Sequence, residues 1–133
     1  MTQALIKALA VMAVAAVANT AHAQQNRGDI RWEPVQVILP SGEQKQYVHS
    51  PNDPNELRLP SVNGWRCSVL GQVIKGAESQ YITCTSDGTH WATAGGTCSD
   101  QKIGEVQGAS VMLTNGDGKG VASISIICSV YPR

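Results

Sequence analysis

The sequence predicts an all-β fold, a small antiparallel β-sandwich or barrel stapled by two disulfides. Residues 121–130 alternate apolar and polar side chains, which is typical of a strand with one buried face. The apolar row of this strand consists of Ala122, Ile124, Ile126, Cys128 and Val130. Short segments of this kind recur between Gly, Pro, Asn and Asp turn signals, and no segment after residue 23 sustains a helical period. The cysteines are four in number, which suits two bridges.

Residues 1–23 have the organisation of a secretory signal peptide. Lys7 supplies one positive charge, residues 8–18 form an apolar run, and Ala21-His22-Ala23 offers the small residues of a cleavage site. We expect cleavage after Ala23 and a periplasmic or secreted protein. The apolar run is too short to span a bilayer, so no transmembrane segment is expected.

Cleavage leaves residues 24–133, 110 residues that suit a single β domain. This segment carries nine basic and ten acidic residues. It therefore lacks the excess of positive charge that is typical of a nucleic-acid-binding protein. We therefore expect no nucleic-acid partner. Residues 24–30 are polar and terminal, and the sequence predicts that they are disordered.

The first elements of the domain alternate with clear turn signals. A strand region is expected over residues 32–39, where Pro34 favours a sheet edge because proline cannot donate to the ladder. After a turn, residues 44–49 can return as a second strand. Residues 50–55 contain two prolines and two asparagines and predict a loop, and residues 57–59 predict a short strand after it.

The four cysteines, Cys67, Cys84, Cys98 and Cys128, are spaced by 17, 14 and 30 positions. These spacings lack the close C-x-x-C pairs of a zinc site, and an exported small domain favours disulfides. If residues 64–70 and 79–84 form a hairpin that turns at Lys75-Gly76, position 67 faces position 84. The sequence therefore favours Cys67–Cys84 with Cys98–Cys128, a pairing that depends on the register of this turn.

The next hairpin is expected at Ser86-Asp87-Gly88-Thr89, because Asp-Gly suits a two-residue type I′ turn. That register places Cys84 opposite Trp91 and predicts an indole beside the disulfide. Residues 99–108 predict a loop or a short helical turn, since Gly104 and Gly108 oppose a longer helix. A strand over residues 110–114 should lead through a glycine-rich connection to the final strand.

The connection at residues 115–120 has some resemblance to the start of a calcium-binding loop. Lys119 stands where a third oxygen ligand would be needed, and Ile126 stands where the loop would need a glutamate. We therefore expect no metal and no cofactor.

Catalytic signatures are also missing from the sequence. The histidines after residue 23 are His49 and His90, and no G-x-S-x-G elbow presents a serine beside either of them. The cysteines are expected to be oxidised, which removes a thiolate nucleophile. Two carboxylates converging across a cleft would still allow a small hydrolase.

The aromatic residues suggest a surface for binding. The chain has three Trp, three Tyr and no Phe, and amphipathic rings of this kind stack on sugars and anchor protein interfaces. Trp65 is expected to pack in the core. The candidate binding surface consists of Trp32, Tyr47, His90 and Trp91.

The function expected from these features is that of a non-catalytic exported binding protein, an enzyme inhibitor or a ligand-binding module that acts through exposed loops. The expected partner is a protein or a glycan of the envelope or the exterior. Two alternatives stay open, an adhesive or pilus-like structural subunit whose final strand pairs with a neighbouring chain, and a small secreted hydrolase.

Overall fold

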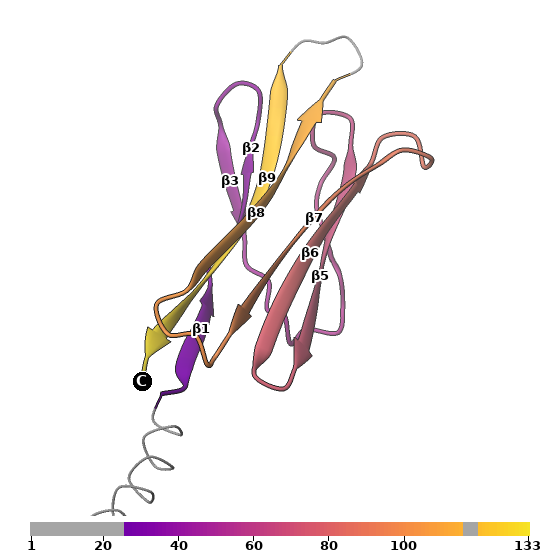
Figure 1. Cartoon of the computed structure of the whole chain (residues 1–133). Helices are drawn as coiled ribbons and strands as arrows, with labels where there is room; N and C mark the ends of the chain where they lie inside the picture. Colours follow the sequence, from indigo (N-terminus) through magenta and orange to yellow (C-terminus); the bar gives the residue numbers. More distant parts are fainter. Residues whose placement is uncertain (1–25, 116–119) are drawn as a thin grey trace, which may run out of the picture.

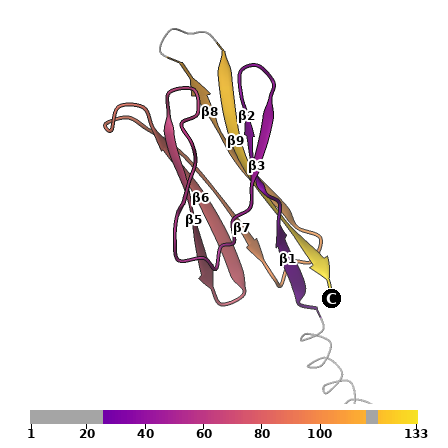
Figure 2. The same ribbon diagram turned by 180° about the vertical axis from the view of Figure 1, so that it is seen from behind.

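A computed structural model describes residues 26–115 and 120–133 of the chain. The described residues form two antiparallel sheets that face each other as a sandwich, which confirms the predicted all-β fold (Figure 1). The strands are β1 (Gly28–Trp32), β2 (Val35–Ile38), β3 (Gln44–Tyr47), β4 (Leu57–Arg58), β5 (Arg66–Ile74), β6 (Ala77–Thr85), β7 (Trp91–Ser99), β8 (Val106–Thr114) and β9 (Val121–Pro132). The turn between β2 and β3 and the loop between β6 and β7 lie at one end of the sandwich, and the C-terminus lies at the other (Figures 1 and 2).

Strand β9 is the centre of the first sheet, which we call the β9 sheet. Each of the five apolar residues of its buried face is at most 3% exposed, as the alternation along the strand predicted. β8 pairs with one edge of β9, while β1 and β2 pair with successive parts of the other edge and β3 continues from β2. β8 begins at Val106 rather than at residue 110, because it pairs with β9 along its whole length.

The predicted strand over residues 32–39 is divided into two. β1 ends at Trp32 and β2 begins at Val35, so Pro34 lies in the break, where its missing N–H costs no ladder hydrogen bond. Glu33 still donates its backbone N–H to the carbonyl of Ile127, at 2.9 Å. The break lets one continuous strand, β9, hold two short strands in line.

The prediction of disorder over residues 24–30 is wrong for its last three residues, which begin β1. Gly28 pairs with Pro132 at the end of β9, and its N–H donates to the carbonyl of Asp100 at 2.6 Å. Asp29 accepts a hydrogen bond from Nε of Arg133 at 2.8 Å. A polar segment is ordered here because the C-terminal end of β9 offers it a partner edge.

The second sheet, which we call the β6 sheet, has the strand order β4-β5-β6-β7. β5 and β6 form the predicted hairpin, with Lys75 and Gly76 at φ of 31° and 78° in its turn. Positive φ at both positions is what a two-residue turn of type I′ requires. Cys67 therefore faces Cys84, and these residues form a disulfide as predicted.

The second disulfide joins Cys98 on β7 to Cys128 on β9, and thus links the two sheets. Both cysteines are fully buried. This pairing is also the predicted one. Two disulfides indicate that the protein folds in an oxidising, extracytoplasmic compartment.

The loop between β3 and β4 is tied to the β6 sheet by a buried polar contact. The ring of His49 is within hydrogen-bonding distance of two groups, with Nδ1 2.7 Å from Oε1 of Gln80 and Nε2 3.1 Å from the carbonyl oxygen of Asn55. His49 is 8% exposed and Gln80 is fully buried. Nearby, a Cβ at Gly71 of β5 would collide with the backbone of Pro51, so this close approach needs glycine.

The connection between β7 and β8 contains no helix. Gly104 has φ of 89°, and its N–H donates to the carbonyl of Val130 at 2.9 Å, which anchors the turn on β9. The connection considered above for calcium includes residues 116–119, which lie outside the described residues. In the part of the chain that is described, no helix is long and apolar enough to cross a membrane.

Candidate functional site

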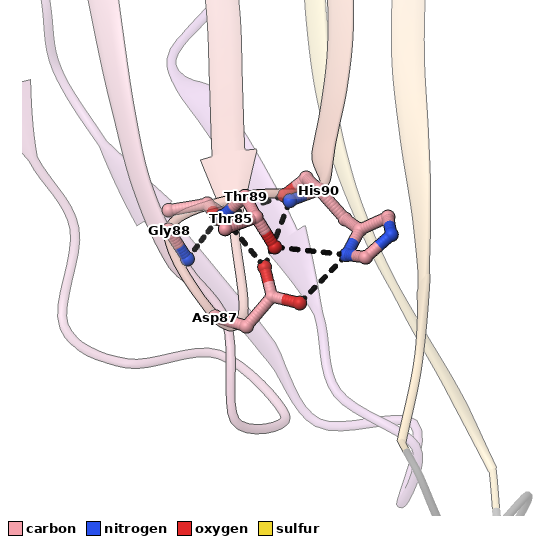
Figure 3. A network of polar contacts seen from close by, with 5 residues as sticks. All are labelled: Thr85, Asp87, Gly88, Thr89 and His90. Atoms are coloured by element: carbon pink, nitrogen blue, oxygen red, sulfur yellow. Dashed lines mark hydrogen bonds and ion pairs between the residues drawn. The ribbon is translucent and has the colours of Figure 1, made fainter.

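The loop between β6 and β7 differs from the predicted two-residue turn. It comprises five residues, 86–90, so Thr85 pairs with Trp91 and Cys84 pairs with Ala92. The polar network of Figure 3 stabilises this wider loop. Oγ1 of Thr85 accepts the N–H of Gly88 at 2.8 Å and donates to the carbonyl of His90 at 2.7 Å.

Asp87 forms the other half of this network. Its Oδ1 accepts the backbone N–H groups of Thr89 and His90, both at 2.8 Å (Figure 3). These hydrogen bonds favour the charged carboxylate. The pKa of Asp87 is therefore well below its ordinary value of 3.8. The backbone N–H of His90 contributes most to this shift, followed by the side chain of His90 and the N–H of Thr89.

The change of one residue in register moves Trp91 to the opposite face of the sheet. Side chains alternate between faces, so Ala92 takes the inward position that was predicted for the indole. Trp91 is 58% exposed. The predicted position of the indole, opposite Cys84 and beside the disulfide, is therefore wrong, and the indole is available at the surface.

The His90 ring does not form a catalytic relay with its neighbours. Oδ2 of Asp87 lies 2.7 Å from Nδ1 of His90, and Oγ1 of Thr89 lies 3.1 Å from the same nitrogen (Figure 3). A nucleophile–histidine–acid triad needs its two partners on opposite ring nitrogens. These contacts organise the loop, and the His90 side chain is 82% exposed.

The charge of Asp87 should give this loop a pH dependence. Because its pKa is lowered on folding, its stabilising contribution is present above the ordinary pKa near 3.8 and is lost as the pH falls below that value. Asp87→Asn keeps an oxygen acceptor but removes the charge. We expect the wild type to have a higher free energy of unfolding than this variant at pH 5.

The difference in free energy of unfolding between the wild type and Asp87→Asn should decrease steadily below pH 3.8. Urea denaturation midpoints of both proteins between pH 5 and pH 2.5 measure it. A margin that grows as the pH falls through this range would contradict the assignment of the hydrogen bonds to the carboxylate.

The residues on the outer face of the β6 sheet form rows that run across the strands. Residues paired in neighbouring strands point to the same face. One row consists of Arg66, Thr85 and Trp91. The next consists of Arg58, Ser68, Thr83 and Thr93. A third consists of Leu70, Tyr81 and Gly95.

A shallow pocket of about 390 Å³ opens on this face, and we call it the Trp91 pocket. Its size falls within the usual range of small-ligand sites. It is lined by Glu56, Arg58, Leu59, Arg66, Cys67, Ser68, Thr83, Thr85 and Trp91. Two arginines and one glutamate give this lining a formal charge of +1.

Arg58 and Glu56 form an ion pair at the rim of the pocket. Nε of Arg58 lies 2.7 Å from Oε1 of Glu56, and the Arg58 side chain is 84% exposed. The hydrogen bond to Arg58 is the main reason that the pKa of Glu56 is lowered from its ordinary value. A pair as exposed as this one remains open to exchange with a ligand, because water weakens it.

The candidate surface residues are not all brought together. His90 and Trp91 are consecutive at the end of the β6–β7 loop. Trp32 and Tyr47 are half-buried and pack against the core, and Nε1 of Trp32 donates to Oε1 of Glu78 at 3.1 Å, which ties β1 to β6. Trp65 also packs against the core, as predicted.

Sequence reasoning missed the polar residues that line the pocket together with Trp91, above all Arg58, Arg66, Ser68 and Thr83. The signal that identifies three of them was present in the predicted hairpin. The register that pairs Cys67 with Cys84 also pairs Arg66 with Thr85 and Ser68 with Thr83, on the opposite face. The position of Arg58 follows from the pairing of β4 with β5, and no turn signal in the sequence predicted that pairing.

Within residues 26–115 and 120–133, no group of three or more His, Cys, Asp or Glu side chains is placed to hold a metal ion. Comparisons of the chain with protein-family models, with curated proteins and with solved structures find no match.

Proposed function

We propose that this protein is a non-catalytic, exported binding protein that holds a glycan in the Trp91 pocket. The observation that carries the proposal is the exposed indole of Trp91 beside a row of hydroxyl and guanidinium groups. A sugar ring has apolar C–H faces and a polar edge. An indole can cover such a face, while hydroxyl and guanidinium groups bond to the edge.

The pocket is built on elements that hold their shape. Arg66, Ser68 and Thr83 stand on paired strands, and the network around Asp87 fixes the loop that leads into Trp91. Strand pairing holds the backbone at these positions, so the backbone of the site loses little conformational freedom when a ligand binds. This arrangement suits a binding module that recognises its ligand without a large rearrangement.

Tyr81 extends the same face beyond the pocket. Its ring lies over Gly95, where a Cβ would stand 2.6 Å from Cδ1 of the tyrosine, and the residue is 42% exposed. Gly95 is four residues from Trp91 along β7, which places the two aromatic side chains about 14 Å apart. Two aromatic rings at this separation suit a chain of several sugar units rather than one monosaccharide.

The proposal includes export by the signal peptide predicted over residues 1–23, with cleavage after Ala23. The two disulfides support an extracytoplasmic location. A protein in the periplasm or outside the cell would meet envelope and extracellular polysaccharides, which are the ligands that we propose.

Trp91→Ala should weaken binding to a polysaccharide ligand by at least about tenfold, which corresponds to about 1.4 kcal/mol. Affinity electrophoresis of the mature, oxidised protein in native gels that contain a panel of neutral and acidic polysaccharides first identifies a ligand. Titration calorimetry of wild type and variant with that ligand then measures the change.

Tyr131→Ala is the control, because Tyr131 is another exposed aromatic residue, at 42%, but stands on β9, in the other sheet. This variant should bind as the wild type does. Retardation by none of the polysaccharides, or equal affinity of the Trp91 variant and the wild type, would refute the proposed site.

The adhesive-subunit alternative receives no support from the final strand. β9 is paired with β8 on one edge and with β1 and β2 on the other, so a neighbouring chain would have to displace one of them. The hydrolase alternative is weakly supported, because Glu56 is the one carboxylate in the lining of the Trp91 pocket, whereas glycosidases use two. An adhesive subunit should polymerise with concentration in size-exclusion chromatography, and a hydrolase should release reducing sugar from the retained polysaccharide.

A further inference from the structure

We infer that the glycan recognised by the Trp91 pocket is acidic, a saccharide with carboxylate-bearing units such as hexuronic or sialic acids, and that Arg66 binds the carboxylate. This inference rests on the proposed function, since it names the class of ligand for the same pocket. It follows from the position of Arg66, from the charge around it and from the hydroxyl groups beside it.

The position of Arg66 suits a ligand that stacks on Trp91. Arg66, Thr85 and Trp91 are direct neighbours on β5, β6 and β7. Adjacent strands are about 4.8 Å apart, so the backbones of Arg66 and Trp91 are separated by about 10 Å. A sugar ring on the indole fills this interval, and a carboxylate on the edge of that ring comes within reach of the guanidinium.

The charge around the pocket favours an anion. The ion pairs found among the described residues join Arg58 to Glu56, His90 to Asp87 and Arg133 to Asp29, so Arg66 takes part in none of them. The lining has a formal charge of +1, although residues 24–133 carry one more acidic than basic residue. A guanidinium offers two parallel N–H donors, which match a carboxylate better than a single sugar hydroxyl.

The rest of the surface favours a saccharide over an acidic peptide. Ser68, Thr83 and Thr93 stand side by side on three strands and present hydroxyl groups next to the pocket. Hydroxyl groups both donate and accept hydrogen bonds, as sugar hydroxyls do. Binding of an acidic peptide through Arg66 alone would use neither this row nor the exposed indole.

The test uses pairs of oligosaccharides that differ only in charge. Each pair consists of a hexuronate- or sialate-containing oligosaccharide and the same molecule with its carboxylates reduced to alcohols, all immobilised on one array, with hexaglutamate as an acidic peptide probe. We expect the acidic member of at least one pair to bind at least tenfold more tightly than its reduced partner. Its binding should weaken when NaCl is raised from 50 to 500 mM.

Arg66→Gln should reduce binding of the acidic member by about tenfold and leave binding of the reduced member unchanged. Lys102→Gln is the matched control, because Lys102 is exposed in the β7–β8 connection, and it should change neither. Arg66 is exposed, so the variant should fold, and circular dichroism checks this point.

The outcomes separate the inference from the proposed function. Reduced members that bind as tightly as acidic members would overturn the inference and leave a glycan-binding protein. Binding of hexaglutamate with the affinity of the best acidic glycan, unaffected by Trp91→Ala, would overturn the saccharide class. Binding of no member of any pair would overturn the inference, and the proposed function would fall with it only if affinity electrophoresis also shows retardation by none of the neutral and acidic polysaccharides.

Discussion

Replacement of both Cys98 and Cys128 with alanine should lower the free energy of unfolding by about 3.6 kcal/mol. The bridge closes a loop of 30 residues, and the chain-entropy estimate for such a loop gives this value. The bridge is also fully buried and joins β7 in one sheet to β9 in the other. The domain should therefore lose a substantial part of its stability, since small domains are stable by only about 5–15 kcal/mol.

Urea denaturation followed by circular dichroism measures this loss, with the slope of the transition fitted for each protein. The comparison variant lacks Cys67 and Cys84, whose bridge closes a loop of 17 residues between strands that are already paired. It should lose about 3.1 kcal/mol, slightly less than the first variant. A loss below about 1 kcal/mol for the Cys98–Cys128 variant would show that sheet packing alone holds the two layers together.

Ile126→Ala should cost about 3 kcal/mol of stability, whereas Ile127→Ala should cost less than about 1 kcal/mol. The two residues are adjacent on β9 and undergo the same chemical change. Ile126 is 1% exposed and belongs to the core between the sheets, while Ile127 is 39% exposed on the outer face. Removal of the Ile126 side chain leaves a cavity that the surrounding strands can fill only in part.

The same urea titration compares the two variants with the wild type. Costs of similar size for the two variants would mean that the burial of the β9 row contributes little, and that the alternation along the strand has been misassigned. A large cost for Ile126→Ala together with a small one for Ile127→Ala would establish which face of β9 supports the fold.

The separation between core and outer face has a consequence for the proposed site. Trp91 and Arg66 are exposed on the outer face, whereas the disulfides and the β9 row are buried between the sheets. Changes at these two exposed positions should therefore affect binding much more than stability. This separation allows the binding measurements to be interpreted without a correction for unfolding.

Local signals predicted the scaffold well. The alternation along residues 121–130 identified the buried face of β9, because side chains in a strand alternate strictly between faces. The position of the Lys75-Gly76 turn determined which residues of β5 and β6 face each other, and thus the pairing of Cys67 with Cys84. With one pair assigned, the other two cysteines had one partner each.

Local signals failed where hydrogen bonds to side chains or to distant strands decide the geometry. Asp-Gly at positions 87 and 88 favours a two-residue turn, but Asp87 and Thr85 accept N–H groups from within a five-residue loop instead. One residue of difference in register reverses the face of every side chain that follows. For that reason the predicted register put the Trp91 indole beside the Cys67–Cys84 disulfide, whereas the residue is exposed, as its inclusion in the candidate binding surface required.

The sequence by itself determined the all-β class, the two disulfides and the buried row of the last strand, because each depends on alternation or on one tight turn. Only the tertiary structure decided that residues 28–30 form a strand, that Pro34 divides β1 from β2, and that Arg58, Arg66 and Trp91 share one pocket. These features depend on pairing between strands that are distant in the chain. The proposed binding site belongs to this second group, since it is assembled from three strands that meet only in the folded sheet.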